Sequence, residues 1–148
     1  MNEIETEIFK YAVKLLGQHD YSVAKLREKI QGKFGEIPEA TIQQLISKRF
    51  LNDRRFAENH VSRHKKRGKP QLRQELLARG ISDGIADEVL SGTDWLSLSD
   101  ALKAKMDAWH LRVPLQPGDA ARLFRAMARL GYEEDGIREE IEQLTHEQ

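Results

Sequence analysis

The segment that organises this chain is Leu72-Arg-Gln-Glu-Leu-Leu-Ala-Arg-Gly-Ile81, in which leucines four residues apart precede a glycine and an isoleucine. Leucines at that spacing lie on one face of a helix, and a glycine just beyond them is typical of a helix end. The pattern recurs over residues 123–132 and, with its glycine one place later, over residues 26–35. These segments open at positions 26, 72 and 123, which are 46 and 51 residues apart, so we predict an internal repeat.

Around these segments, apolar spacing and cap residues predict nine helices, three in each repeat. The first ends at Gly17, the second runs from Ser22 to near Gly32 and Gly35, the third opens at Pro38, the fourth runs from Asn52 or Asp53 to about Arg67, and the fifth lies between Pro70 and Gly80. The sixth opens at Ser82, the seventh runs from Thr93 or Asp94 to Trp109, the eighth runs from Asp119 to Leu130, and the ninth begins at Asp135 or Gly136. Residues after Leu144 are expected to fray, and no stretch has a strand pattern.

The predicted fold class is therefore all-α, with three tandem three-helix repeats over residues 1–47, 48–92 and 93–148. Repeats of this size stack mainly on their neighbours, which predicts an elongated, curved molecule. The composition agrees, because 39% of the residues are hydrophobic and 32% are charged. A single large globule of 148 residues would be expected to have a larger apolar share.

Several classes of protein are excluded by residues that the sequence lacks. It has no cysteine, which rules out disulfides, cysteine-ligated metal sites and thiol catalysis. No apolar run approaches the length of about 18 residues that a transmembrane helix needs. The first ten residues are acidic where a signal peptide would be basic, so export is not expected. We expect a cytoplasmic protein without a membrane partner.

The net charge is zero, but the charges are segregated along the chain. Residues 1–47 have a net charge of −1, residues 48–80 have 11 basic and 3 acidic residues for a net charge of +8, and residues 81–148 have a net charge of −7. Such segregation produces local potentials that attract a polyanion or a charged protein surface.

The candidate binding residues are basic side chains of the fourth predicted helix, of the turn that follows it and of the start of the fifth. They are Arg54, Arg55, Arg63, Lys65, Lys66, Arg67, Lys69 and Arg73, and Gly68 among them allows close approach of the backbone. Arginine donates paired hydrogen bonds to phosphate or carboxylate, and lysine adds a mobile point charge. The pattern favours a polyanion or an acidic protein as ligand. A solvated basic helix end, stabilised by the helix dipole, is the alternative.

No set of residues indicates catalysis or a cofactor. His60 and His64 have the i,i+4 spacing of metal ligands, but neighbouring cations and the lack of a completing carboxylate favour packing instead. The acidic pairs, such as Asp87 and Glu88, point in different directions on a helix. Trp95 and Trp109 are expected to pack in the core or between repeats rather than stack on bases. We expect no enzyme, no metal and no cofactor.

Three stretches of this chain resemble the RecX family of recombinase regulators. They are Phe50-Leu-Asn-Asp-Arg-Arg-Phe-Ala-Glu-Asn59, Arg67-Gly-Lys-Pro70 with the following Leu72-Arg-Gln-Glu-Leu76, and Arg79-Gly-Ile-Ser82. The first repeat adds Ala12-Val-Lys-Leu-Leu16 and Ser22-Val-Ala-Lys-Leu-Arg27. Phe50 and Asn52 replace the tyrosine and first aspartate usual in the family, and Asn52 can still cap a helix. The C-terminal repeat is more divergent.

The resemblance implies three tandem three-helix repeats without catalytic activity. It implies binding to the RecA recombinase filament on single-stranded DNA, and to DNA itself, single-stranded and double-stranded. Such proteins limit filament extension and suppress ATP hydrolysis, strand exchange and coprotease function, which places them in recombination, DNA repair and the SOS response. We expect a monomer whose basic residues contact DNA or RecA. The alternative is a sequence-independent DNA-binding helical module with no recombinase partner.

Overall fold

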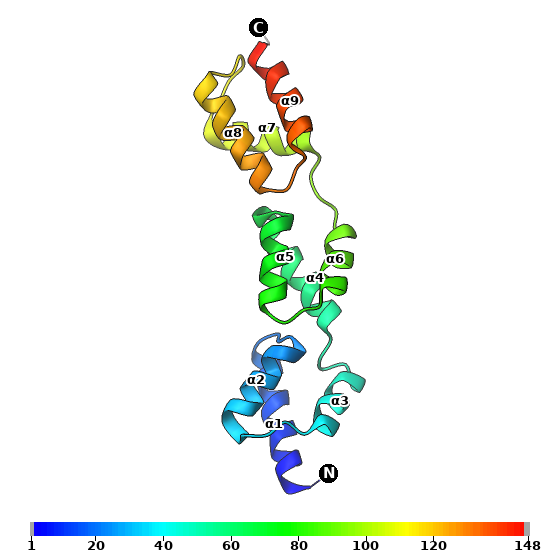
Figure 1. The fold of residues 1–148 in the computed structure, drawn as a ribbon. Coiled ribbons are helices and arrows are strands. Elements are labelled where there is room, and N and C mark those ends of the chain that lie inside the picture. The colour runs from blue at the N-terminus through cyan, green and yellow to red at the C-terminus, as the bar shows by residue number, and fades with distance from the viewer. Residues whose placement is uncertain (1, 147–148) are drawn as a thin grey trace. The chain divides into compact units, whose positions relative to one another are not determined.

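The computed structural model describes residues 2–146, and within that range every regular element is a helix. The helices are α1 (Glu3–Gln18), α2 (Val23–Phe34), α3 (Glu39–Ser47), α4 (Asp53–Arg63), α5 (Lys69–Ala78), α6 (Asp83–Ser91), α7 (Leu98–Trp109), α8 (Pro117–Arg129) and α9 (Glu134–His146), with a short 3₁₀ helix at Lys65–Arg67 (Figure 1). The all-α class and its three-helix groups are confirmed. None of the helices of residues 2–146 combines the length and the apolar character needed to cross a membrane.

The predicted helix starts at Ser22 and Ser82 are confirmed. The Ser22 hydroxyl accepts from the Lys25 backbone N–H at 3.2 Å, and the Ser82 hydroxyl accepts from that of Ile85 at 3.3 Å. Each therefore satisfies one of the backbone donors that a helix leaves unpaired at its start. The first helix ends one residue later than predicted, at Gln18.

The fourth helix ends earlier than predicted, at Arg63 rather than at about Arg67. His64 leaves the helical conformation with φ −129° and ψ 28°, and the chain continues as the 3₁₀ helix to Gly68. Like charges three or four residues apart destabilise a helix, and the cations of this stretch would be stacked at that spacing if α4 continued. Residues 65–69, Lys-Lys-Arg-Gly-Lys, are called the basic turn below.

The starts of the seventh and eighth helices also differ from the prediction. Helix α7 begins at Leu98 because Ser97, not Thr93 or Asp94, caps it by accepting from the Asp100 backbone N–H at 3.1 Å. Helix α8 begins at Pro117, not at Asp119, since proline suits the first helical position. Trp95 consequently lies outside α7, in the segment that precedes it.

The ninth helix begins at Glu134 and runs to His146, so the expected fraying after Leu144 is wrong for Thr145 and His146. The Thr145 hydroxyl donates to the Ile141 carbonyl at 2.8 Å within this last turn. The expectation for residues 147 and 148 lies outside the described residues.

The described chain divides into two compact units, each with its own interior. One unit comprises the residues up to Arg63 together with Arg73–Gly92, and the other comprises His64–Leu72 together with the residues from Thr93 onward. The basic turn thus belongs to the second unit, with α7, α8 and α9. The repeat boundaries expected from the sequence and the elongated, curved shape stay predictions.

In the first unit, α1, α2 and α3 enclose one apolar core. Its buried members are Ile8, Ala12, Leu26, Ile30, Ile42, Leu45 and Leu51. The start of α2 is also fixed by residues distant in sequence. The Ser22 hydroxyl donates to the Arg79 carbonyl, and the Asp53 carboxylate accepts from the Val23 backbone N–H at 2.8 Å. Gly80, at φ +81°, lies so near Ala24 that an added Cβ would clash with the alanine Cβ.

In the second unit, α7, α8 and α9 gather around another core (Figure 1). Its buried members are Ala101, Leu102, Met106, Leu115, Leu123, Met127, Ile137 and Ile141. Two glycines with positive φ allow the chain around the basic turn to pack closely against the end of α8. An added Cβ on Gly68 would be 2.7 Å from the Cα of Leu130, and one on Gly131 would be 2.9 Å from the Cδ of Pro70. Any larger residue at these positions would therefore force the two segments apart.

Candidate functional site

Arg54 is on the surface of α4 but is engaged with carboxylates of the same unit. Its guanidinium donates to Glu88 of α6 at 2.6 Å and to Glu58 of its own helix at 3.2 Å. The hydrogen bond to Glu88 is the main reason that the pKa of Arg54 lies above its ordinary value. Two carboxylates offset this charge, so Arg54 contributes less to attracting an anion than its position suggests.

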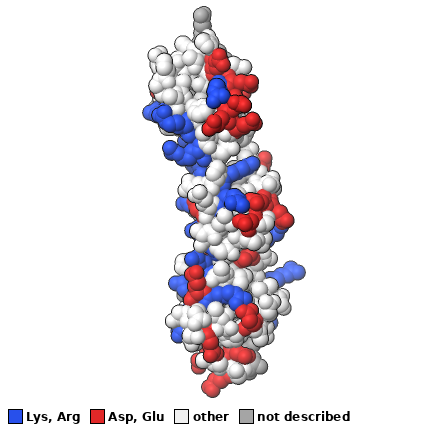
Figure 2. Space-filling view, viewed as in Figure 1, with Lys and Arg blue, Asp and Glu red and all other residues white. Residues whose placement is uncertain are grey.

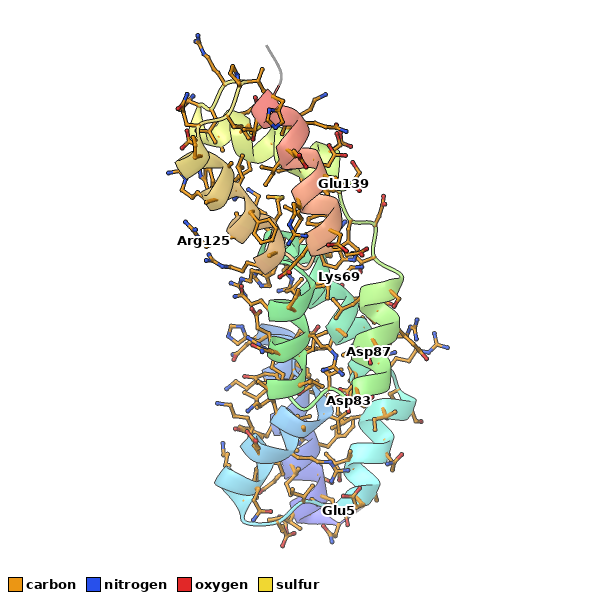
Figure 3. All side chains as sticks on the ribbon, turned by 45° about the horizontal axis from the view of Figure 1, so that its top comes forward. Glu5, Lys69, Asp83, Asp87, Arg125 and Glu139 are labelled. Carbon is orange, nitrogen blue, oxygen red and sulfur yellow. The ribbon has the colours of Figure 1, made fainter. Side chains whose placement is uncertain are left out.

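Arg73 of α5 is compensated in a similar way. It donates to Asp87 at 2.8 Å and to Asp83 at 3.4 Å, both on α6, the helix where Figure 3 labels them. The hydrogen bond from Arg73 holds the pKa of the Asp87 carboxyl below its ordinary value. These pairs are exposed and contribute little to stability, but they occupy the arginine fork.

Arg55 points its guanidinium at backbone carbonyls. It donates to the carbonyl of Arg49 at 2.9 Å and to that of Phe50 at 3.3 Å. Arg49 has φ +66°, so Arg55 braces a turn with a left-handed residue between α3 and α4. The hydrogen-bond donors of its guanidinium are therefore engaged by the protein's own backbone, although its positive charge remains at the surface.

The lysines of the basic turn have no carboxylate partner among residues 2–146. Lys65 donates to the backbone carbonyl of Asp94 at 3.3 Å, and the Lys69 ammonium lies 5.7 Å from the centre of the Trp95 ring. Lys66 is exposed and has no ion pair among residues 2–146. Arg63, the exposed last residue of α4, is likewise without one in that range, and Arg67 is exposed. Ion pairs to carboxylates therefore engage Arg54 and Arg73, whereas the lysines of the basic turn have no such partner in the part of the chain that the structure describes.

A groove of about 530 Å³ opens beside the basic turn within the second unit. Its lining combines a lysine rim with an apolar floor. The lining residues are Lys65, Lys66, Gly68, Lys69, Asp94, Trp95, Leu96, Ala101, Ala104, Lys105, Ala108, Leu130, Gly131 and Tyr132. No pattern in the sequence indicates this groove, because its walls come from the basic turn, the segment before α7, the face of α7 and the turn after α8.

Helix α8 has a row of arginines that sequence reasoning did not select. Arg122, Arg125 and Arg129 follow one another at helical spacing, and Figure 3 shows Arg125 extending away from the side where Glu139 of α9 lies. Arg122 is 3.9 Å from Asp119 and covers the Trp109 ring at 4.1 Å. The helical spacing within the predicted eighth helix was a signal that could have found this row.

The acidic C-terminal part is consequently not acidic on every side. Figure 2 shows Asp and Glu gathered over α9 and Lys and Arg over the side of α8. The acidic side chains of α9 are Glu134, Asp135, Glu139, Glu140 and Glu142. Charge segregation in this protein thus exists within a single unit as well as along the chain.

Of the two histidines with i,i+4 spacing, His60 lies in α4 and is explained by packing, as predicted, whereas His64 lies just beyond the helix end. The His60 ring is 8% exposed, stacks on Phe56 with ring centres 6.2 Å apart, and places Nε2 2.8 Å from Glu75 Oε1. Among the described residues, no group of three histidine, cysteine or acidic side chains is placed to hold a metal ion.

Both tryptophans are half-buried in the second unit. Trp109 packs against the core of α7, α8 and α9, with Arg122 over its ring, which confirms packing as its role. Trp95 lines the groove beneath Lys69. Its ring face is thereby already in contact with a cation.

Fold and surface together define a class of protein: an all-α chain of three-helix groups, with uncompensated lysines around a groove. The family model described as "RecX, second three-helix domain" matches residues 52–90. A protein named "Regulatory protein RecX" from Chlorobium phaeobacteroides (strain BS1) is 34% identical over 149 residues, covering 95% of this chain and 95% of that relative. This chain belongs to the RecX family of regulatory proteins.

Other relatives and one solved structure agree with this assignment. Proteins with the same name from Haemophilus influenzae (strain PittEE) and Thermus thermophilus are each 39% identical, over 66% and 57% of this chain and 68% and 61% of the relative. The crystal structure of RecX from Lactobacillus salivarius superposes with a TM-score of 0.75, covering 94% of this chain and 97% of that chain. At 17% sequence identity, that likeness shows the fold alone.

Proposed function

We propose that this protein is a non-catalytic negative regulator of the RecA recombinase. It binds the RecA filament on single-stranded DNA and inhibits filament extension, ATP hydrolysis, strand exchange and coprotease activity. It acts in the cytoplasm as a monomer, in recombination, DNA repair and the SOS response. The basic residues contact DNA phosphates or acidic RecA surface, and the acidic side chains of α9 contact basic RecA surface.

Membership of the RecX family supports the regulatory part of this proposal. The observation that supports a polyanionic partner is the set of lysines in the basic turn, which have no carboxylate partner within the described chain. Uncompensated lysines retain their long-range attraction for an anionic surface, whereas ion-paired Arg54 and Arg73 do not retain theirs to the same extent.

The test is the rate of ATP hydrolysis by the cognate RecA on single-stranded DNA with substoichiometric amounts of this protein. We expect the wild-type protein to inhibit hydrolysis and shorten filaments seen by electron microscopy. Reversing charge at Lys65→Glu, Lys66→Glu and Lys69→Glu together is expected to abolish both effects.

The matched control reverses the same amount of charge elsewhere. Lys10, Lys14 and Lys103 are exposed and lie outside the groove, so their combined change to glutamate is expected to leave inhibition intact. Equal loss of inhibition in the two triple variants, or no inhibition by the wild-type protein, would contradict the proposal.

The alternative function is that of a sequence-independent DNA-binding helical module without a recombinase partner. Binding through lysine and arginine to phosphates would be strongly salt-dependent and would not require RecA. Titrations against naked and RecA-coated single-stranded DNA separate the two functions. Tighter binding to coated DNA supports the regulator, and equal affinity supports the module.

A further inference from the structure

We infer that the groove beside the basic turn binds an acidic peptide segment of a partner protein through one apolar anchor side chain. The inference deepens the proposed function and rests on it, because it assigns lysines of the same basic surface to a protein ligand rather than to DNA phosphates. Four lysines at the groove, Lys65, Lys66, Lys69 and Lys105, would face the carboxylates of that segment.

The charge of the groove favours an anionic occupant. Asp94 is the only carboxylate among the described lining residues, and its backbone carbonyl, not its side chain, accepts from Lys65. Lys66 has no partner among residues 2–146, and Lys69 and Lys105 lie over the rings of Trp95 and Trp109. A cation over an aromatic face still has ammonium protons to donate to a carboxylate.

The floor of the groove favours an apolar anchor. Ala101, Ala104 and Ala108 follow one another on α7 at helical spacing, and their small side chains leave room in the groove, which Leu130 also lines. Leu96, which also lines the groove, is 60% exposed and adds apolar surface that an anchor side chain could cover. A volume of about 530 Å³ lies within the range of pockets that enclose a buried ligand group.

The same lining is unsuited to nucleic acid. Single strands bind by stacking bases on free aromatic faces while cations follow the backbone. The Lys69 ammonium already lies over the Trp95 ring, and the Tyr132 hydroxyl donates a hydrogen bond to the carbonyl of Leu96. Burial also raises the pKa of the Tyr132 phenol, in keeping with a ring held in the wall. A phosphate backbone would leave the apolar floor without a partner, whereas a leucine between carboxylates would satisfy floor and rim together.

The experiment measures fluorescence anisotropy of a short labelled peptide in which one leucine is flanked by glutamates. We expect the wild-type protein to bind it, with affinity falling as salt is raised. Replacing the peptide leucine by serine should weaken binding by about tenfold or more, because a buried leucine side chain is worth that much. A labelled thymidine oligonucleotide is the nucleic-acid arm.

The decisive variant is Ala104→Trp, which fills the groove without changing charge; Ala121→Trp, on an exposed position of α8, is its matched control. Loss of peptide binding in Ala104→Trp, with oligonucleotide binding and the control unchanged, supports the inference. Parallel loss of peptide and oligonucleotide binding would show a nucleic-acid site and overturn it. Unchanged peptide binding in Ala104→Trp would overturn it as well.

A second measurement covers the event that Ala104→Trp fails to fold. In a Trp109→Phe variant, Trp95 is the remaining tryptophan, and it lines the groove. We expect its emission to shift to the blue when the leucine peptide binds and to stay unchanged with the serine peptide. No shift with either peptide would reject the groove as the site.

The two proposals fail in different ways. Inhibition of RecA by a protein that does not bind the peptide would leave the regulator standing and remove the groove's assignment. Peptide binding by a protein that does not inhibit RecA would leave the groove's assignment standing and remove the proposed regulatory function.

Discussion

At the scale of single residues, the backbone conformation of Gly68 determines where the lysines of the basic turn are placed on the surface. Its φ of +81° and ψ of 162° belong to a region that glycine alone adopts readily. Its Cα faces the Leu130 backbone so closely that no Cβ fits. The lysines on either side are therefore positioned by a residue that has no charge and no side chain.

Gly68→Ala is expected to destabilise the protein by about 2 kcal/mol or more, because backbone strain and overpacking each cost that order of energy. Urea denaturation followed by circular dichroism measures the change. Gly32→Ala is the matched control, since Gly32 lies inside α2 with open space around it. That variant should be slightly more stable than wild type. A Gly68→Ala protein as stable as wild type would show that the turn adapts without cost.

Residues also differ in how far their roles can be predicted from the local sequence. Ser22 and Ser82 are both recognisable as N-caps, and both caps were predicted. The second bond of Ser22, to Arg79, spans 57 residues and has no local signal. Arg54 and Arg73 looked like free cations because their partners on α6 are 34 and 14 residues away.

At the scale of elements, the start of α2 is anchored more firmly than the start of α6. Ser22 is fully buried, caps α2 and donates to the Arg79 carbonyl, whereas Ser82 is exposed and only caps α6. Removing Ser22 would therefore leave a helix donor and a distant, partly buried carbonyl without partners.

We expect Ser22→Ala to lower the free energy of unfolding by about 2–3 kcal/mol, of which the cap accounts for about 1 kcal/mol. Ser82→Ala should cost only about 1 kcal/mol, the value of a cap alone. Chemical denaturation of the two variants side by side measures the difference. If both cost the same, the bond to Arg79 adds nothing to stability.

Helix boundaries show where local signals compete. Trp95 and Leu98 have the spacing of one helical face, so the sequence favoured a start at Thr93 or Asp94. In the structure Ser97 caps the helix instead, so Trp95 lies in the preceding segment, where it lines the groove. Which of several cap residues is used depends on how the segment before the helix packs, and neighbouring sequence does not contain that information.

At the scale of the whole molecule, the net charge of zero conceals two opposed faces within one unit. Arg125 and Arg129 of α8 are exposed and have no ion pair within the described chain, and the acidic residues gather over α9 (Figure 2). Cations that are not paired internally can release counterions from a nucleic acid when they bind its phosphates.

Changing Arg125 and Arg129 together to alanine is expected to reduce the salt dependence of binding to single-stranded DNA. The slope of log affinity against log salt should become shallower by about 1.4, since each lost contact removes about 0.7. Nitrocellulose filter binding over a salt series measures the slope. Lys10 and Lys14 changed to alanine, on α1, should leave it unchanged. An unaltered slope in the arginine variant would mean that DNA lies elsewhere.

Helix spacing, caps and charge are local properties, so the all-α class, the three-helix groups and the concentration of basic residues near Gly68 could all be predicted from the amino-acid order. Two other features required the folded chain: which cations stay uncompensated, and how the basic turn joins α7 and α8 around a groove. Both depend on contacts between residues far apart in the chain. The ion pair between Arg73 and Asp87 of α6 offsets positive charge on one surface. The close packing of Gly68 on Leu130 places the lysines of the basic turn together beside the groove.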